Sequence, residues 1–314
     1  MEQKGVVVIG ELNVDIILNH IDGFPAVGKE ILAGDLTLTL GSSSAIFAGN
    51  LASLGVPVIF IGKVGRDQFA ELVLSSLRER KVDTTGIVTS GEVNTGATVV
   101  LNYGQDRANV TYPGAMNYLT AADIDFSLLE QAGHLHFSSY FLQPGIKKDL
   151  PGIFKRAKQM GLTTSLDPQW DPSEEWDFPL KELLPWVDVF LPNEGELMSI
   201  SGSATVDEGI AKLKVAARHI VVKNGTEGAV GWDGERIIRQ PAFMNTEVVD
   251  CIGAGDSFNA GFIYEYTRQK SLPDCMRTGA LTGAINTTRA GGTGAFESLE
   301  LVRSIAKTCF NMAI

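Results

Sequence analysis

The stretch "DCIGAGDSFNAGF", residues 250–262, places two glycines and an alanine between two aspartates and then continues with apolar residues at helical spacing. Phe258 and Phe262 are four residues apart, so they share one side of a helix that the pattern predicts to begin near Asp256. The preceding "TEVVD" (246–250) is rich in β-branched residues and predicts a strand. The stretch therefore predicts a strand, a flexible turn and a helix.

This turn places Gly253, Ala254 and Gly255 at the amino end of the predicted helix. Backbone N–H groups there have no partner inside the helix and the helix dipole is positive, so such ends bind anions. Glycines also let the backbone approach a phosphate closely. Asp256 would then lie beside the phosphate as a proton acceptor. The alternative is an ordinary glycine turn in which Asp256 only caps the helix.

Composition and charge indicate a globular protein that binds small molecules. The chain has 314 residues and a formal charge of −11, which disfavours a nucleic-acid partner because that partner needs a basic face. The continuous apolar run near the start, Val6–Ile9, is too short for a signal sequence or a membrane span. Three cysteines without C-x-x-C spacing, Cys251, Cys275 and Cys309, predict reduced thiols and a cytoplasmic location.

Short apolar runs recur along the chain, with helical patterns between them. Runs rich in β-branched residues and closed by Gly, Pro or Asn predict strands buried on both faces of a parallel sheet. These runs are residues 5–10, 57–62, 134–139, 163–168, 186–193 and 219–225. Helices are predicted at 67–81, after an Asp cap, and at 147–160, with a break near Pro151. The predicted fold class is α/β, a doubly wound and mostly parallel sheet flanked by helices.

Two segments, 30–40 and 96–114, instead alternate apolar and polar residues and contain turn residues. This pattern predicts an antiparallel sheet with one face open to solvent. We expect a small β lid, formed by about 11–40 and 94–117, on a single domain that spans residues 1–314. The lid is expected to close over a substrate and to form a homodimer through its exposed face.

The stretch "DCIGAGDSF" resembles the second signature of the ribokinase-like, or PfkB, carbohydrate kinase family, whose usual form is D-T-x-G-A-G-D. Other features similar to that family follow in the expected order over nearly the whole chain. They are "GELNVD" (10–15), "GSSSAIFAGNLASLG" (41–55), "GKVGRDQF" (62–69), "YPGAMNYL" (112–119), "LPNEGE" (191–196) and "VKNGTEGA" (222–229). The resemblance implies a ribokinase-like fold and transfer of the ATP γ-phosphate to a hydroxyl of a sugar or nucleoside, with ATP and Mg²⁺ required.

The resemblance also implies roles for individual residues on the phosphate side. Asp256 resembles the catalytic base of the family, and residues 253–255 resemble its anion hole. Asn193 and Glu196 resemble the N-x-x-E motif that organises Mg²⁺ and its waters near the phosphates. The same spacing is also that of a helix capping box.

The nucleotide loop of the family is matched by Lys223, Gly225 and Gly228. In the family these glycines let the chain pass close to ATP. A plain hairpin turn is the alternative for the same three residues.

On the acceptor side, Asn13 and Asp15 match polar positions that in the family bind sugar hydroxyls from the end of the first strand; an exposed Asn-x-Asp is the alternative. Gly41 begins the first glycine-rich signature, which departs from the usual pattern at two places. Ser42 stands where a second glycine is usual, and Ile46 stands where sugar kinases often have Asn. Loss of an amide there predicts a substrate with a less polar face, such as a nucleoside or a deoxy or modified sugar.

A monovalent cation such as K⁺ is held in some members of the family by a loop near the second signature. The positions that match this loop are Asp250 and the carbonyls of Ile252, Asn286, Arg289, Gly291 and Ala295.

Two other pairs of residues have simple interpretations. His134 and His136 alternate on one strand without a third metal ligand at useful spacing, so strand packing is the prediction. Trp170 and Trp176 follow a predicted strand and belong either to the core or to the acceptor pocket.

Other function classes fit the sequence less well. A nicotinamide dehydrogenase needs G-x-G-x-x-G after the first strand, where one glycine is present. A P-loop ATPase needs Ser or Thr after its Gly-Lys pair, and neither Gly28-Lys29 nor Gly62-Lys63 has one. The remaining alternatives are a nucleoside kinase of the same fold and a non-catalytic sugar or nucleotide sensor. Asp256 argues against a sensor, which has no need of a base, so the sequence predicts a sugar kinase.

Overall fold

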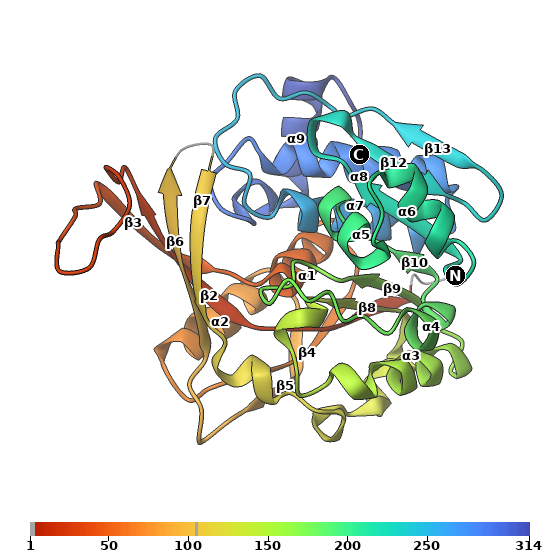
Figure 1. Cartoon of the computed structure of the whole chain (residues 1–314), viewed down its shortest axis with the longest axis horizontal. Helices are drawn as coiled ribbons and strands as arrows, with labels where there is room; N and C mark the ends of the chain where they lie inside the picture. The colour runs from red at the N-terminus through yellow and green to blue at the C-terminus, as the bar shows by residue number, and fades with distance from the viewer. Residues whose placement is uncertain (1–3, 104–105) are drawn as a thin grey trace.

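A nine-stranded sheet forms the body of the protein in the computed structural model, which describes residues 4–103 and 106–314 (Figure 1). In spatial order its strands are β13 (Ile237–Gln240), β12 (Ala229–Trp232), β11 (His219–Lys223), β10 (Val189–Phe190), β9 (Thr163–Asp167), β8 (Ala132–Ser138), β1 (Gly5–Ile9), β4 (Val58–Val64) and β5 (Asp83–Thr89). All neighbours from β11 to β5 pair in parallel, whereas β12 and β13 are antiparallel. The predicted fold class is confirmed.

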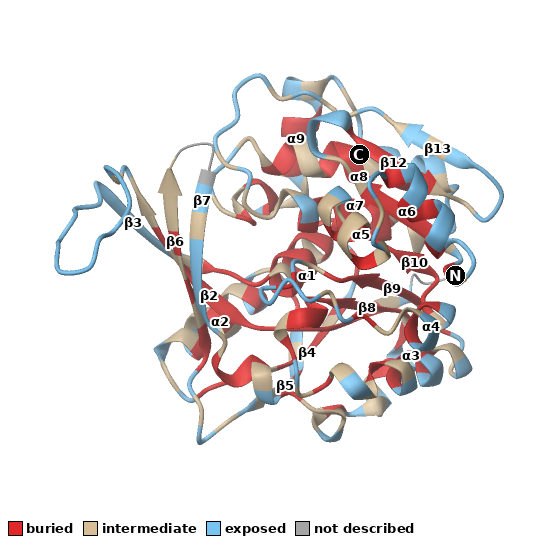
Figure 2. Cartoon of the chain, viewed as in Figure 1, coloured by how far each residue is buried: buried red, intermediate tan, exposed pale blue. Residues whose placement is uncertain are grey.

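Helices cover both faces of this sheet. One face packs against α1 (Ser43–Ser53), α2 (Gln68–Glu79), α7 (Ala254–Tyr266), α8 (Leu272–Asn286) and α9 (Leu299–Phe310). The other packs against α3 (Leu150–Gln159), α4 (Leu180–Leu183), α5 (Glu194–Ser201) and α6 (Val206–Leu213). Side chains alternate along a strand, so Val6 and Val8 of β1 enter the first core while Val7 and Ile9 enter the second. Figure 2 shows the central strands buried between the two helical layers.

The two predicted helices are present. Asp67 caps α2 by accepting a hydrogen bond from the Ala70 amide at 2.9 Å. A short 3-10 turn at Lys147–Asp149 precedes α3, so the break predicted near Pro151 lies at the start of this helix.

Two predicted strands differ from the structure. The segment 186–193 contributes only the two residues of β10. The segment 246–250 is not a strand. Val248 and Val249 are more than half exposed, and Asn245 turns the chain by accepting the Glu247 amide at 3.0 Å. The β-branched residues therefore have no neighbouring strand to pair with.

The lid is a separate four-stranded sheet that projects from the body (Figure 1). Its strands, in spatial order, are β3 (Asp35–Leu40), β2 (Asn13–Asn19), β6 (Gly96–Tyr103) and β7 (Asp106–Tyr112). The two outer pairs are antiparallel, but β2 and β6 pair in parallel, so the prediction of an antiparallel lid is wrong at its centre. The reason is that β2 follows β1 and β6 follows β5, and both leave the same edge of the parallel sheet.

Register gives the lid two different faces. Ile16 lies opposite Leu38 and Val99, and Val99 lies opposite Val110, so these four side chains share one face. We call this the outer lid face; it also carries Leu18, Leu36, Leu101, Ala108 and Tyr112. The opposite face carries polar groups, including Asp15 at the position opposite Thr98.

Within the described ranges 4–103 and 106–314, no helix has the length and apolar character needed to cross a membrane.

Candidate active site

A cleft of about 1230 Å³ lies between the carboxyl edge of the large sheet and the polar face of the lid. One half is lined by lid residues, α1 and the loop after β9, and we call it the acceptor half after its expected ligand. The other is lined by the loops after β11 and β13 and by α8, and we call it the nucleotide half for the same reason. The turn of residues 253–256 lies between these halves and lines the cleft as well.

The glycine turn forms the amino end of α7, as predicted. Gly253 is the N-cap residue with φ 75°, a left-handed conformation that favours glycine. A Cβ at Gly253 would also lie 2.6 Å from the Cα of Gly292. No acceptor within the described part of the chain binds the amides of Gly255 and Asp256. These amides are therefore available to an anion in the cleft.

Asp256 is the third residue of α7 and is not its cap, so the capping interpretation is wrong. Its side chain is buried at the base of the cleft, and its Oδ1 accepts a hydrogen bond from Gln169 Nε2 at 3.1 Å. Burial, with the negative charge of Asp167 nearby, raises the pKa of Asp256 well above its ordinary value. A carboxylate with a raised pKa is a stronger base.

A buried ion pair lies beside this aspartate. Lys223 Nζ, at the end of β11, is 2.5 Å from Oδ2 of Asp167, at the end of β9. Asp167 is fully buried, and its Oδ2 also accepts from Asn259 Nδ2. Burial alone lowers the pKa of Lys223, but the charges of Asp167 and Glu196 outweigh burial and raise it. Lys223 therefore stays charged next to the glycine turn.

Asn193 and Glu196 form the capping box of α5. Oδ1 of Asn193 accepts the Glu196 amide at 2.8 Å, and Oε2 of Glu196 accepts the Asn193 amide at 2.8 Å. Both residues also line the cleft, so the capping and metal interpretations apply to the same pair. Burial, followed by the charge of Asp167, raises the pKa of Glu196 to about 7.

The donor set suits Mg²⁺ held through water. The described residues contain no cluster of three or more His, Cys, Asp or Glu side chains arranged as metal ligands. Mg²⁺ usually takes only one or two protein carboxylates and fills its remaining positions with water and phosphate oxygens. Glu196, which is buried at the cleft wall, fits that requirement.

The loop after Lys223 is both a hairpin and a wall of the cleft. Strands β11 and β12 pair antiparallel across it, and Asn224 donates to the Gly228 carbonyl at 2.8 Å. Gly228 has φ 91°, and a Cβ there would lie 2.0 Å from the Gln240 carbonyl oxygen. Lys223, Gly225 and Gly228 all line the nucleotide half.

Asn13 and Asp15 lie on β2 of the lid, so their predicted place at the end of the first strand is wrong. Asn13 Nδ2 donates to Asp15 Oδ1 at 3.1 Å and to Thr98 Oγ1 at 3.0 Å. A Cβ at Gly41 would lie 2.2 Å from Asp15 Oδ1, so a larger residue there would displace the Asp15 side chain. Burial raises the pKa of Asp15 to about 6. These side chains form a fixed polar wall, and the exposed alternative is wrong.

Ser42 has a positive φ, which the glycine that is usual at this position in the family signature would adopt easily. Its φ is 69°, its Oγ donates to the Glu11 carbonyl at 2.6 Å, and the same Oγ caps α1 by accepting the Ala45 amide. Ile46 lines the cleft and packs beneath the glycine turn, since a Cβ at Gly253 would lie 3.0 Å from its Cγ2.

The loops that were predicted to hold a monovalent cation are joined by the Asp250 carboxylate. Asp250 accepts the amides of Ile252 and Gly291, each at 2.9 Å. Asn286 donates to the Ile252 carbonyl at 2.6 Å. The structure thus brings four of the six predicted positions together, and the amide of a fifth, Arg289, donates to the Asn286 carbonyl at 3.4 Å.

The histidines are structural. His134 bonds Thr163 and Ser165, and His136 bonds Ser165 and Ser138, all at 2.7–2.8 Å. Burial lowers the pKa of His134 to about 3, so it is neutral.

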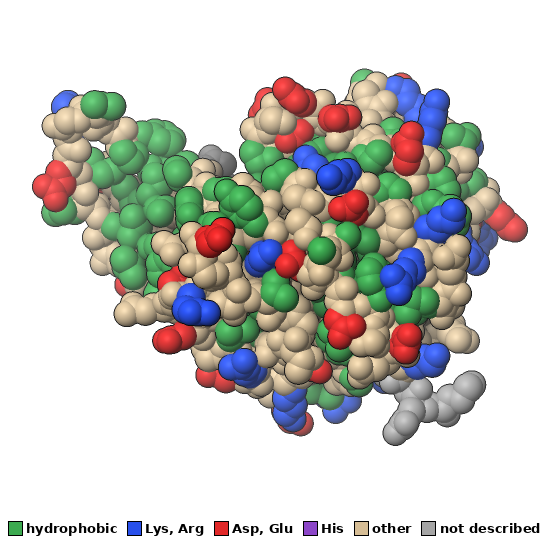
Figure 3. Space-filling view, turned by 90° about the horizontal axis from the view of Figure 1, so that it is seen from below, with side chains coloured by type: hydrophobic (Ala, Val, Ile, Leu, Met, Phe, Trp, Pro, Cys, Tyr) green, Lys and Arg blue, Asp and Glu red, His purple; other side chains and the backbone are tan. Residues whose placement is uncertain are grey.

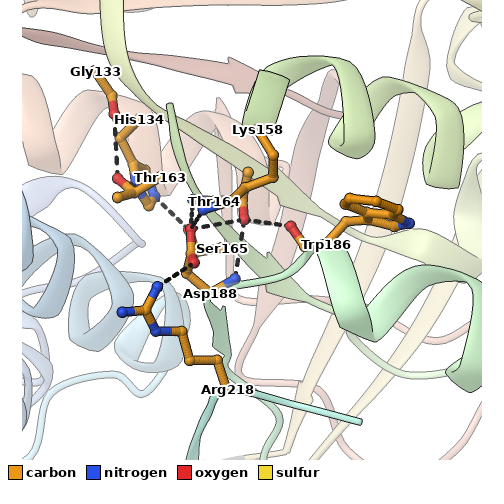
Figure 4. Close-up of polar contacts among 9 residues, drawn as sticks. All are labelled: Gly133, His134, Lys158, Thr163, Thr164, Ser165, Trp186, Asp188 and Arg218. Carbon is orange, nitrogen blue, oxygen red and sulfur yellow. Dashed lines mark hydrogen bonds and ion pairs between the residues drawn. The ribbon is translucent and has the colours of Figure 1, made fainter. Parts of the chain in front are cut away.

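At the amino edge of the strands, Asp188 accepts hydrogen bonds from Lys158 and the Thr164 amide and pairs with Arg218 (Figure 4). This cluster joins β9, β10 and β11 at the opposite edge from the cleft.

The two tryptophans have different environments. Trp170 is 49% exposed and lines the cleft. Trp176 packs against Trp170 and Phe141 with its ring edge-on, at centroid distances of 4.9 and 5.4 Å. Trp176 therefore packs against the core, whereas Trp170 lines the cleft.

Several site residues were not predicted from the sequence. Asp167, Gln169 and Asn259 form the polar floor beside Asp256. Glu11 is buried behind Ser44, and burial raises its pKa. Asp167 could have been found, because it is the last residue of a buried strand, at the edge where ligands bind in α/β sheets.

The comparisons with known proteins agree with this geometry. Residues 3–299 match the family described as pfkB family carbohydrate kinase. A ribokinase of Lactococcus lactis is 27% identical over 307 residues, which cover 96% of this chain and 97% of the relative.

Solved structures match this chain as well, and two of them show the extent of the similarity. One is an adenosine kinase of Sinorhizobium meliloti, with TM-score 0.82, 25% identity and coverage of 92% of this chain and 95% of that one. The other, from E. coli, was solved in complex with ATP and Mg²⁺; it has TM-score 0.84, 25% identity and coverage of 97% and 99%.

Proposed function

Because the chain belongs to the pfkB family of carbohydrate kinases, we propose that its cleft transfers the ATP γ-phosphate to a hydroxyl of a sugar, with Asp256 as the base. The single observation that carries the assignment of roles is the position of Asp256. Its buried carboxylate faces the cleft on the same helical turn as the amides of Gly255 and Asp256, which no described residue accepts. A base and an anion site therefore lie within one turn of helix.

Asp256 accepts the proton of the acceptor hydroxyl as that hydroxyl attacks the γ-phosphate. Its Oδ1 accepts a hydrogen bond from Gln169, which fixes the orientation of the carboxylate in the cleft. The amides of Gly255 and Asp256 stabilise negative charge on the transferred group, because they are fixed before the reaction begins.

Lys223 supplies positive charge at the same place and is held there by Asp167. Asn193 and Glu196 would hold Mg²⁺ through its waters. Mg²⁺ held there would neutralise part of the negative charge of the phosphates.

The nucleotide half binds the rest of ATP. Its walls contain small and apolar residues, among them Phe243, Ala280 and Gly283. A Cβ at Gly283 would lie 3.2 Å from the Ala254 carbonyl, so glycine keeps α8 close to the turn and leaves space for a flat purine ring.

Asp15 gives the acceptor affinity a defined pH dependence. Because burial raises its pKa to about 6, Asp15 is protonated below that pH and then accepts fewer hydrogen bonds from hydroxyls. The KM for the acceptor is therefore expected to rise as the pH falls through about 6. In Asp15→Asn the acceptor KM should be high at every pH and lose this dependence. The same pH dependence of KM in parent and variant would contradict the assignment.

A nucleoside is the second candidate for the acceptor. Trp170 presents a half-exposed aromatic ring to the cleft, and Phe141 and Ile46 line it too. Aromatic rings stack on bases, and an adenosine kinase is among the matched structures.

The experiment that tests the function is ADP formation measured across sugars, sugar acids and nucleosides, each at several concentrations. We expect turnover with sugars, or with nucleosides if the second candidate is correct. Tight binding of one of these compounds without any ADP formation would support the sensor instead.

We also propose that the outer lid face joins two copies of the chain. Leu36, Val110 and Tyr112 are each more than half exposed on this face, and Figure 3 shows hydrophobic side chains gathered over the protruding lid. Apolar patches of this kind mark interaction surfaces. A second copy buries the same face by symmetry and leaves the polar face free to close over the acceptor.

Val110→Lys is expected to shift the protein from dimer to monomer in sedimentation velocity, because it places a charge within the buried patch. Val215→Lys is the matched control, since Val215 is 85% exposed on the body and away from the lid. A parent that sediments as a monomer at micromolar concentration would contradict the dimer.

Two finer assignments complete the proposal. The loops joined by Asp250 hold a monovalent cation such as K⁺; turnover that is equal in K⁺ and Li⁺ salts would oppose this. The enzyme is placed in the cytoplasm, as the three free cysteines suggest.

A further inference from the structure

Gln169 has an unusual backbone conformation beside Asp256. Its φ is 59°, in the left-handed region that favours glycine, so a non-glycine residue there is strained. Neighbouring hydrogen bonds fix the chain on the amino-terminal side of this residue. The Ser139 amide donates to the Asp167 carbonyl at 3.1 Å, and the Tyr140 amide donates to the Pro168 carbonyl at 3.0 Å. The fold thus imposes the conformation, although glycine would adopt it more easily.

The side-chain amide of Gln169 connects two carboxylates. Its Nε2 donates to Asp167 Oδ2 and to Asp256 Oδ1, each at 3.1 Å. A primary amide has two N–H groups. One can therefore donate to Asp167 while the other donates to Asp256. A glycine at 169 would relieve the backbone but lose both hydrogen bonds.

These hydrogen bonds connect Lys223, on the phosphate side of the site, to the Asp256 carboxylate. Lys223 and Asn259 both donate to the same Asp167 oxygen that Gln169 contacts. Lys223 therefore fixes Asp167, Asp167 fixes the Gln169 amide, and that amide fixes Asp256.

We propose that Gln169 is a positioning residue that turns one oxygen of Asp256 toward the acceptor hydroxyl and couples this base to the Asp167–Lys223 pair. The inference rests on the proposed function in one respect, which is the role of Asp256 as base.

A neutral hydrogen-bond donor at position 169 suits the surroundings of Asp256 better than a charged side chain does. The charged groups that face Asp256 are Asp167 after β9, Lys223 after β11 and Glu11 after β1, and Ser43 contributes a hydroxyl. A carboxylate at 169 would add a further negative charge to this set, whereas a lysine would hold Asp256 as a weak base. The amide orients the carboxylate and leaves its net charge environment unchanged.

Gln169→Gly tests the inference because it removes the amide and also removes the backbone strain, so the fold is expected to survive. Turnover should fall about 10- to 100-fold, with both KM values within about threefold, as expected for loss of one hydrogen bond to a charged group. The acid limb of the kcat profile should move up by about one to two pH units, because that hydrogen bond favours the ionised form of Asp256.

Two further variants separate the effects of side-chain length and charge from the effect of the backbone conformation. Asn tolerates the left-handed conformation, but Gln169→Asn is one methylene too short to reach both carboxylates, so its turnover should lie between those of the parent and Gln169→Gly. Gln169→Glu should raise the acid limb further than Gln169→Gly does, because it adds a negative charge.

Gln269→Gly is the matched control. Gln269 also has φ 59° but is exposed after α7, so the same substitution relieves the same strain far from the cleft. Its turnover and pH profile should equal those of the parent.

A second readout does not need turnover. Carbon NMR of ¹³C-labelled aspartate carboxyls, with the Asp256 signal identified by its loss in Asp256→Asn, follows the titration of Asp256 directly. An unchanged Asp256 titration in Gln169→Gly, together with kcat within about twofold of the parent, would overturn the inference while Asp256→Asn remains inactive. Parent-like activity in Asp256→Asn would instead overturn the proposed function.

Discussion

Asp256→Asn is expected to lower turnover by about 10²–10⁴-fold, the usual effect of losing a general base. The substitution keeps the size of the side chain and its hydrogen bond with Gln169, because the Asn carbonyl oxygen can accept from the same amide. It removes the group that takes the proton. The free energy of unfolding should stay the same or rise slightly, since a buried carboxylate beside Asp167 is replaced by a neutral amide.

Steady-state kinetics, a nucleotide-binding isotherm and a melting curve on this variant measure the three effects separately. ATP binding should persist, because the substitution removes a negative charge near the phosphates. Asp207→Asn is the control, since Asp207 is well exposed on α6 and away from the cleft. Turnover within a few-fold of the parent in Asp256→Asn would contradict its assignment as base.

Lys223→Met is expected to lower the free energy of unfolding by about 3–5 kcal/mol, the usual cost of removing one partner of a buried ion pair. Asp167 is completely buried and would lose its counter-charge. Glu196 and Asp256, which also face Lys223, would then be harder to ionise. Chemical denaturation measures the loss of stability, and the kcat profile should show its acid limb at higher pH.

Two companion variants make this result specific. Arg239→Met breaks an ion pair whose side chains are both about 60% exposed, so it should cost less than about 1 kcal/mol. Adding Asp167→Asn to Lys223→Met removes the uncompensated charge and should restore part of the lost stability. An unfolding free energy within about 1 kcal/mol of the parent in Lys223→Met alone would contradict a buried and mutually dependent pair.

The positions of most parallel strands along the chain and the glycine turn could be predicted because they depend on local patterns. Buried parallel strands appear as apolar runs, and an anion-binding helix end needs glycines at the turn. Residues 246–250 show where this reasoning fails. Their valines follow the strand pattern, but the Asn245 turn and the lack of a neighbouring strand leave them exposed at the cleft.

The lid shows a different limit. Alternation predicted its two faces, but the parallel pairing of β2 with β6 depends on the edge from which both strands leave the body. That edge is a property of the whole topology. For the same reason, Asn13 and Asp15 were expected at the end of the first strand although they lie on a strand of the lid.

The candidate site was predicted where a residue type and its spacing carry the chemistry, as for Asp256 and the Asn193–Glu196 pair. It was missed where the role depends on a distant neighbour. Gln169 is marked by a left-handed backbone and by bonds to Asp167 and Asp256, none of which is visible in the sequence around it. Asn259 follows a helical pattern and contacts Asp167 only because α7 packs over the end of β9.

The most direct test of the account follows the phosphate itself. ATP labelled at the γ-phosphorus is incubated with the acceptor that gives the fastest ADP formation, and the label is traced by chromatography. The account predicts that the label appears on the acceptor, in amounts equal to the ADP formed, with the parent and only at trace rates with Asp256→Asn. Label that appears only as inorganic phosphate, or equal transfer by both proteins, would contradict a kinase that uses Asp256 as its base.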